Sequence, residues 1–193
     1  MSSANVLPDN AVHDTAGRAA ATAGWDGVVL PPLRLSGFAV HPVVAIDREV
    51  CEERLNAQQY PETDMSTLAM WEGWSADLGP APPNSPLSIT GFISTASPRR
   101  ALYGLDVLSG YGAGLILFES RRRPSEWTMR ECDLAGAFMV WSSADGCECV
   151  VTGRYGPVAT ARRTVATRQK EEILFAHALR SGQMRSGRGA LRS

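Results

Sequence analysis

The clearest structural signal in the chain is the segment Ala137-Phe-Met-Val-Trp-Ser-Ser-Ala-Asp-Gly-Cys-Glu-Cys-Val-Val151. Two runs of residues that favour strands, 137–141 and 147–151, flank the pair Asp145-Gly146. An Asp-Gly pair between two such runs is the strongest short-range signal for a β-hairpin, because both residues tolerate the positive φ angles of a tight turn. We therefore predict an α+β fold in which this hairpin, 137–151, lies at the centre of an antiparallel sheet.

Further strands are predicted outward from the hairpin, giving a sheet of four to six strands. Short apolar runs supply them at 28–30, 33–46, 87–93 and 115–118. Pro42 lies within the second run and lacks the N–H that a ladder needs, so this run forms two short strands or one edge strand. Residues 120–135 are compatible with a helix capped by Ser125 or with a strand.

Two helices in the N-terminal half are expected to pack on this sheet. The first, 47–59, begins at Asp47 as N-cap and stops before Pro61. The second, 65–78, ends at Gly79-Pro80. It carries an apolar stripe that consists of Leu68, Trp71, Trp74 and Leu78.

A C-terminal helix is predicted over about 162–181. Its segment 173–179, Ile-Leu-Phe-Ala-His-Ala-Leu, is apolar on all sides. A helix with one buried face has a polar back, so this helix has contacts on more than one side. We expect Leu174 and Phe175 to form part of a partner-binding surface, and Leu174→Asp or Phe175→Asp to abolish association while the chain stays folded.

The domain organisation follows from composition. Residues 1–24 are small and polar and predict a flexible arm, 25–182 form a single α+β domain, and 183–193 form a flexible, arginine-rich tail. Within the domain, 80–86 contains four prolines and predicts a stiff connector.

Composition and charge exclude several classes of protein. The hydrophobic content of 44% is too high for a disordered chain, and no apolar run is long enough for a membrane helix. The absence of a secretory signal and the four cysteines in 193 residues predict a cytoplasmic protein. Eighteen of the 19 basic residues are arginine, which is typical of a GC-rich bacterial genome.

The net charge of −1 is a cancellation of two opposite charges. Residues 1–96 hold 11 acidic and 4 basic side chains, whereas 97–193 hold 9 acidic and 15 basic ones. Arginine clusters at 99–100, 121–123 and 162–163 therefore lie in a basic half, where they favour an acidic partner.

No motif fixes a chemistry. Cys132, Cys147 and Cys149 are weak candidates for a metal site, since structural zinc sites have two ligand pairs and this chain has a single Cys-x-Cys. We therefore predict no metal and no cofactor. An enzyme would use a thiol or histidine near Cys147, Cys149 and His41, although we leave catalytic residues unassigned.

Our leading hypothesis is a non-catalytic protein-binding protein, such as an adaptor, a specialised chaperone or an assembly component, that binds a protein partner or its own copies. The expected partner-binding residues are Trp71, Trp74, Arg121, Arg122, Arg123, Leu174 and Phe175. Two alternatives stay open: an enzyme with a Cys/His site, and a protein that binds nucleic acid through its arginines.

Overall fold

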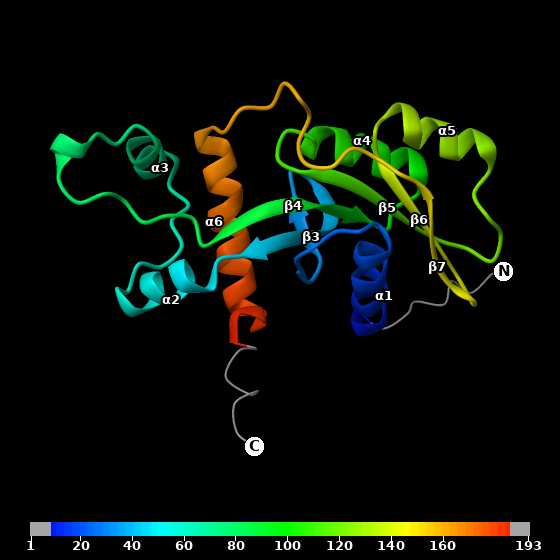
Figure 1. The fold of residues 1–193 in the computed structure, drawn as a ribbon, viewed down its shortest axis with the longest axis horizontal. Coiled ribbons are helices and arrows are strands. Elements are labelled where there is room, and N and C mark those ends of the chain that lie inside the picture. Colours follow the sequence, from blue (N-terminus) through cyan, green and yellow to red (C-terminus); the bar gives the residue numbers. More distant parts are fainter. Residues whose placement is uncertain (1–8, 186–193) are drawn as a thin grey trace, which may run out of the picture.

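The computed structural model describes residues 9–185. They form an α+β fold in which six α-helices surround a curled, mixed seven-strand sheet shaped as a half-barrel (Figure 1). The strands are β1 (Val28–Val29), β2 (Leu33–Leu35), β3 (Phe38–Ile46), β4 (Leu87–Ser94), β5 (Ala113–Glu119), β6 (Phe138–Ser143) and β7 (Gly146–Val151). The helices are α1 (Asp9–Thr22), α2 (Arg48–Asn56), α3 (Met65–Glu72), α4 (Pro98–Leu108), α5 (Glu126–Leu134) and α6 (Val165–Arg180), with short 3-10 turns η1 (Ala76–Leu78) and η2 (Gln183–Arg185).

The predicted hairpin is present, but it does not lie at the centre of the sheet. β6 and β7 pair antiparallel around the turn, with Ser143 opposite Gly146. The strand order is β1-β3-β4-β5-β6-β7, and β2 pairs with β3, so the hairpin forms one edge. The position expected for it was wrong, because a hairpin signal reports only on two neighbouring strands and carries no information about their place in a sheet.

The prediction of an antiparallel sheet is also wrong, since β4, β5 and β6 run parallel. Parallel neighbours need a crossover connection, usually a helix. Here α4 connects β4 to β5 and α5 connects β5 to β6. Residues 120–135 therefore contain a helix, and the Ser125 hydroxyl caps it by accepting a hydrogen bond from the Thr128 N–H.

Pro42 lies inside β3 and not at the sheet edge. On one side of β3, β2 pairs with Phe38–Val40 and β1 pairs with Val43 and Val44. The Pro42 carbonyl accepts a hydrogen bond from the Leu30 N–H on that side. Because Pro42 falls between the two short partner strands, its missing N–H interrupts neither ladder.

The two predicted N-terminal-half helices are present, and the first has the expected cap. Asp47 accepts a hydrogen bond from the Val50 N–H at the start of α2, and Asp64 does so from the Thr67 N–H at the start of α3. The second helix ends earlier than expected, at Glu72 before Gly73, and a separate 3-10 turn follows.

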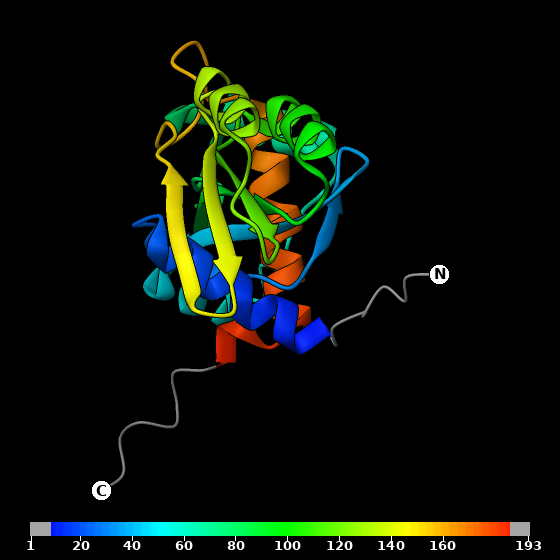
Figure 2. The same ribbon diagram turned by 90° about the vertical axis from the view of Figure 1, so that its right-hand side faces the viewer.

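Part of the predicted flexible arm, residues 1–24, is helical in the structure. Residues 9–22 form α1, which packs across the inner side of the hairpin and sheet (Figure 2). Ala16, Ala19, Ala20 and Ala23 are buried there against Val43, Leu115 and Val140. These alanines recur at i, i+3, i+4 and i+7, the spacing of a helix face, and their small side chains let the helix approach the sheet closely.

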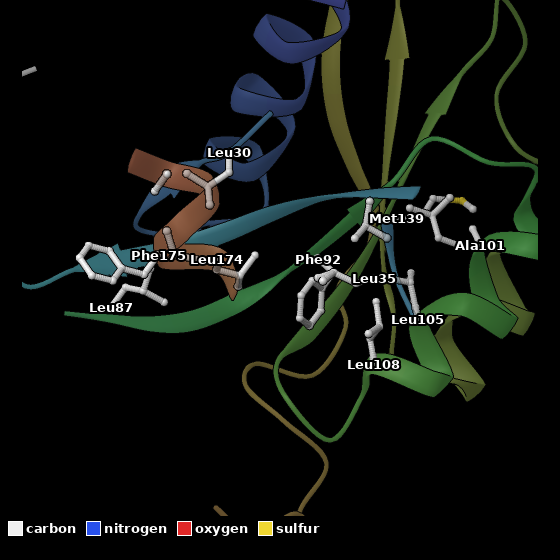
Figure 3. Close-up of a cluster of buried hydrophobic side chains, with 14 of the residues drawn as sticks. Leu30, Leu35, Leu87, Phe92, Ala101, Leu105, Leu108, Met139, Leu174 and Phe175 are labelled. Atoms are coloured by element: carbon white, nitrogen blue, oxygen red, sulfur yellow. The ribbon is translucent and has the colours of Figure 1, made fainter. Parts of the chain in front are cut away.

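The two sides of the sheet carry separate apolar cores. One core, on the side of α1, includes Trp25, which packs edge-on against Phe138 with 5.5 Å between ring centroids. The other core joins the sheet to α4, α5 and α6. In Figure 3 its side chains gather in two groups, Leu30, Leu87, Leu174 and Phe175 around α6 and Leu35, Leu105, Leu108 and Met139 beside α4.

The predicted C-terminal helix is present as α6. Within residues 9–185, no helix is both long and apolar enough to cross a lipid bilayer. Of the expected tail, Gln183–Arg185 form η2, and 186–193 lie outside the described residues.

Candidate functional site

A buried ion-pair network joins α6 to α2 and forms the base of the candidate site. The Glu172 carboxylate is fully buried and receives two hydrogen bonds from the Arg54 guanidinium, at 2.7 and 3.1 Å. Arg168, one helical turn earlier on α6, donates to the same carboxylate from Nε at 3.1 Å. The Glu62 N–H donates a further hydrogen bond at 3.1 Å.

The two arginines also donate hydrogen bonds to backbone carbonyls of the loops around them. Arg54 donates to the carbonyls of residues 59, 60 and 84, and Arg168 donates to that of Pro83 at 2.5 Å. Burial lowers the pKa of the Arg168 guanidinium, and the Glu172 charge opposes this shift. Because its charges are paired and hydrogen-bonded, the network holds the structure together and is not an open ligand site.

The network holds residues 47–79, which we call the α2–α3 lobe, against α6. The lobe contains α2, α3 and η1, and it projects from the sheet on the side opposite the hairpin (Figure 1). Arg163 provides a second connection, because it forms ion pairs with Glu171 at 2.8 Å and with Glu72 of α3 at 3.5 Å. These ion pairs tie the lobe to α6, and the buried side chains of Cys51 and Leu68 add apolar contacts.

Several large apolar side chains of the α2–α3 lobe are exposed. Only Leu68 of α3 is buried. The large apolar side chains that remain exposed are Tyr60 at 66%, Met65 at 43%, Met70 at 55% and Leu78 at 56%. Exposed apolar surface of this kind can be buried against another molecule.

The predicted partner-binding tryptophans belong to this lobe. Trp71 and Trp74 are both half-buried. The Arg168 guanidinium lies 5.4 Å from the centroid of the Trp71 ring, so part of that ring packs on the ion-pair network. The Trp74 Nε1 is buried and has no hydrogen-bond partner within the described structure.

The α2–α3 lobe is also strongly acidic. Residues 47–79 contain eight carboxylates and two arginines, and one of those arginines, Arg54, is buried against Glu172. The carboxylates of α2, at Glu49, Glu52 and Glu53, are exposed. Exposed methionine and aromatic side chains among carboxylates suit a segment that is both apolar and basic.

The placement of Leu174 and Phe175 does not fit the expected partner-binding surface. Both side chains are 0% exposed, in the core between α6 and the sheet (Figure 3). The helix does have contacts on more than one side, but the same chain supplies them: the sheet packs on one side and the α2–α3 lobe on another.

Two of the three arginine clusters lie at the same end of the sheet. Arg99 and Arg100 follow β4 in the first turn of α4, and Arg121–Arg123 follow β5. Since β4 and β5 are parallel, their carboxyl ends lie at the same edge. Arg123 pairs with Glu148 of β7 at 2.9 Å, with both side chains about half exposed. Binding of nucleic acid through these arginines stays a prediction.

The structure separates the three cysteines of the weak metal prediction. Cys132 is buried in the core shared with α4 and α6, whereas Cys147 and Cys149 pack on the α1 side of the sheet. Within residues 9–185, no group of three or more His, Cys, Asp or Glu side chains is arranged to hold a metal ion.

His41 and His177 have different surroundings. His41 is buried on β3, and its ring stacks on that of His13 with 6.1 Å between centroids. His177 Nε2 lies 2.9 Å from the Pro31 carbonyl oxygen, a contact that ties α6 to the segment before β2. Of the cysteines, Cys51 lines a cavity of about 530 Å³ between α2, β3 and η2.

Burial raises the pKa of the Cys51 thiol, and it raises that of Cys132 to about 11. A catalytic thiolate needs a lowered pKa, so neither thiol has the environment of a nucleophile.

These environments predict the order of thiol reactivity. At pH 8, iodoacetamide is expected to modify the partly exposed Cys147 and Cys149 in the native protein, and Cys51 and Cys132 only after unfolding in guanidinium. Peptide mass spectrometry measures the extent of modification at each cysteine. Native Cys132 that reacts as fast as Cys147 would contradict this order.

The raised pKa of Cys132 also makes stability depend on pH. Between about pH 9 and 11, the Cys132 thiol is ionised only in the unfolded chain, so its contribution to the free energy of unfolding falls as the pH rises.

The buried network is the feature that the sequence predictions missed. Its one local signal is the i,i+4 spacing of Arg168 and Glu172 on the C-terminal helix. Arg54 lies 118 residues from Glu172 in the chain, so no local pattern connects them.

Neither a model of a known protein family, nor a curated protein, nor a solved structure matches this chain.

Proposed function

We propose that this chain is a protein-binding module whose α2–α3 lobe docks a basic, amphipathic segment of a partner protein. The observation that carries the proposal is the combination of four exposed, large apolar side chains with a surplus of carboxylates on one projecting lobe. Burying the apolar side chains against a partner supplies affinity, and the carboxylates select the basic partner and speed its approach.

The side chains of the lobe suit a partner segment that is not rigidly defined. Met65 and Met70 are unbranched and polarizable, and such side chains adapt to irregular apolar surfaces. Tyr60 presents an apolar ring with a polar tip, the kind of residue enriched where protein surfaces meet. The ion-pair network beneath keeps α2 and α3 in place while their outer surface stays open.

The test is site-specific photo-crosslinking in the cells that produce the protein. A benzophenone amino acid at Met70 is expected to capture a partner through a basic, amphipathic segment, identified by mass spectrometry of the adduct. The matched control carries the same amino acid at Leu134 of α5, which is 81% exposed but lies outside the lobe. Equal capture from both positions would contradict docking on the lobe.

A substitution pair then tests the chemistry of the surface. With the captured segment as a peptide, Met70→Lys is expected to weaken binding by about tenfold or more, because it removes an apolar contact and adds a like charge. Glu53→Arg is expected to weaken binding mainly at low salt, where exposed charges are least screened. Binding that is unchanged in both variants would overturn the proposal.

A further inference from the structure

A second cavity, separate from the α2–α3 lobe, lies at the carboxyl end of β4. It has a volume of about 240 Å³ and is lined by β2, β3, the end of β4 with the residues that follow it, and α4. In sheets with parallel strands, ligands bind outside the carboxyl ends of those strands. Figure 1 shows α4 on the far side of α6 from α3, so this cavity is remote from the proposed protein-binding surface.

Two arginines from distant parts of the chain line this cavity. Arg34 comes from β2 and Arg100 comes from the first turn of α4. Arg34 makes a long hydrogen bond of 3.5 Å to the Gly37 carbonyl. Among the described residues, neither Asp nor Glu lines the cavity. An anion bound in this cavity would gain attraction from both guanidinium groups.

The rest of the cavity combines hydroxyl groups with an apolar wall. Ser94 is 3% exposed, and its Oγ accepts a hydrogen bond from the Ala96 N–H at 3.4 Å, which leaves its own proton to donate. Thr95 supplies a second hydroxyl, and Phe38 and Leu105 supply apolar surface. Gly104 allows α4 to pack directly against the Phe38 ring, because a Cβ at this position would lie 2.7 Å from that ring.

We propose that this cavity, which we call the Arg34–Arg100 cavity, binds a small phosphate monoester whose phosphate lies between the two arginines and whose apolar body packs on Phe38 and Leu105. A phosphate monoester carries close to two negative charges at pH 7 and three acceptor oxygens, which match two guanidinium groups and the hydroxyls. Nothing in this inference depends on the protein-binding function of the lobe.

The experiment uses the full chain and three probes in isothermal titration calorimetry: phenyl phosphate, inorganic phosphate and benzyl alcohol. Phenyl phosphate is expected to bind with a dissociation constant of about 1 mM or tighter. Inorganic phosphate is expected to bind more weakly, since it lacks the apolar body, and benzyl alcohol is expected not to bind. Binding of inorganic phosphate that equals that of phenyl phosphate would overturn the apolar part of the proposal.

Variants place the binding in the cavity. Arg34→Gln and Arg100→Gln are each expected to weaken phenyl phosphate binding about tenfold or more, and both positions are exposed, so the fold is retained. Arg121→Gln is the matched control, because it removes an exposed arginine from the same edge of the sheet that does not line the cavity. An equal loss in all three variants would show general charge attraction, and no loss in Arg34→Gln and Arg100→Gln would show binding elsewhere; either result overturns the proposal.

A fourth variant separates this inference from the proposed function. Met70→Lys on the α2–α3 lobe is expected to leave phenyl phosphate binding unchanged. A phosphate site that is lost in Met70→Lys would mean that the two regions are not independent, and it would contradict the location proposed here.

Discussion

Glu172→Gln is expected to lower the free energy of unfolding by about 3–5 kcal/mol, because it leaves the buried guanidinium groups of Arg54 and Arg168 without their carboxylate. Glutamine has nearly the same shape as glutamate and keeps one acceptor oxygen. The expected loss is therefore electrostatic and not a packing defect. Urea denaturation followed by circular dichroism measures it.

Glu148→Gln is the matched control for this prediction. It removes the carboxylate of the Arg123–Glu148 pair, whose side chains are about half exposed on the surface of the sheet. An exposed pair contributes less than about 1 kcal/mol, since water screens its charges. Equal destabilisation by the two substitutions would show that burial does not set the strength of the network.

Leu174→Asp is expected to prevent folding altogether. Truncating a buried leucine costs about 2–5 kcal/mol, and an unpaired carboxylate in the same place adds several more. Together these costs reach the total stability of a typical domain, about 5–15 kcal/mol. The far-ultraviolet circular dichroism spectrum of the purified variant, and its recovery in the soluble fraction, measure the outcome.

The same substitution at an exposed leucine provides the control. Leu134→Asp changes a side chain that is 81% exposed at the end of α5, and a stability change within about 1 kcal/mol is expected there. This pair of variants also decides between two interpretations of the apolar C-terminal helix. A folded Leu174→Asp variant that has lost only association would support the surface expected from sequence and contradict the burial of Leu174.

The elements that sequence patterns predicted correctly are those whose signals are local. The Asp145-Gly146 turn, the Asp47 cap of α2 and the apolar α6 each depend on residues within a few positions of one another. The helix α1 had such a signal as well, in the spacing of Ala16, Ala19, Ala20 and Ala23. Its small side chains and polar neighbours led us to expect a flexible arm.

In the candidate site, too, the features with local sequence signals were predicted better than those that depend on packing. Trp71 and Trp74 belong to the lobe that we propose as the binding surface, but α3 ends at Glu72, so Trp74 and Leu78 do not continue the helical stripe expected from their spacing. Leu174 and Phe175 were expected on that surface because an all-round apolar helix predicts contacts without naming the partner. The structure shows that the chain itself provides those contacts.

Arg34 and Arg100 show why local sequence patterns do not predict which distant residues meet in the folded chain. Arg34 and Arg100 lie 66 positions apart, and they reach one cavity because β2 pairs with β3, β3 pairs with β4, and α4 follows β4. Each pairing is set by free energies summed over whole strands and by the closure of loops between them.

Local patterns in the sequence indicated the hairpin and the presence of α2, α3 and α6, since caps, turns and apolar periodicity act over a few residues. Only the tertiary structure decided that β4, β5 and β6 run parallel, that the hairpin forms an edge, and that the sheet and the α2–α3 lobe cover α6. The physical reason is that a helix or strand specifies how much apolar surface must be buried, whereas the identity of the surface that buries it depends on the packing of the whole chain.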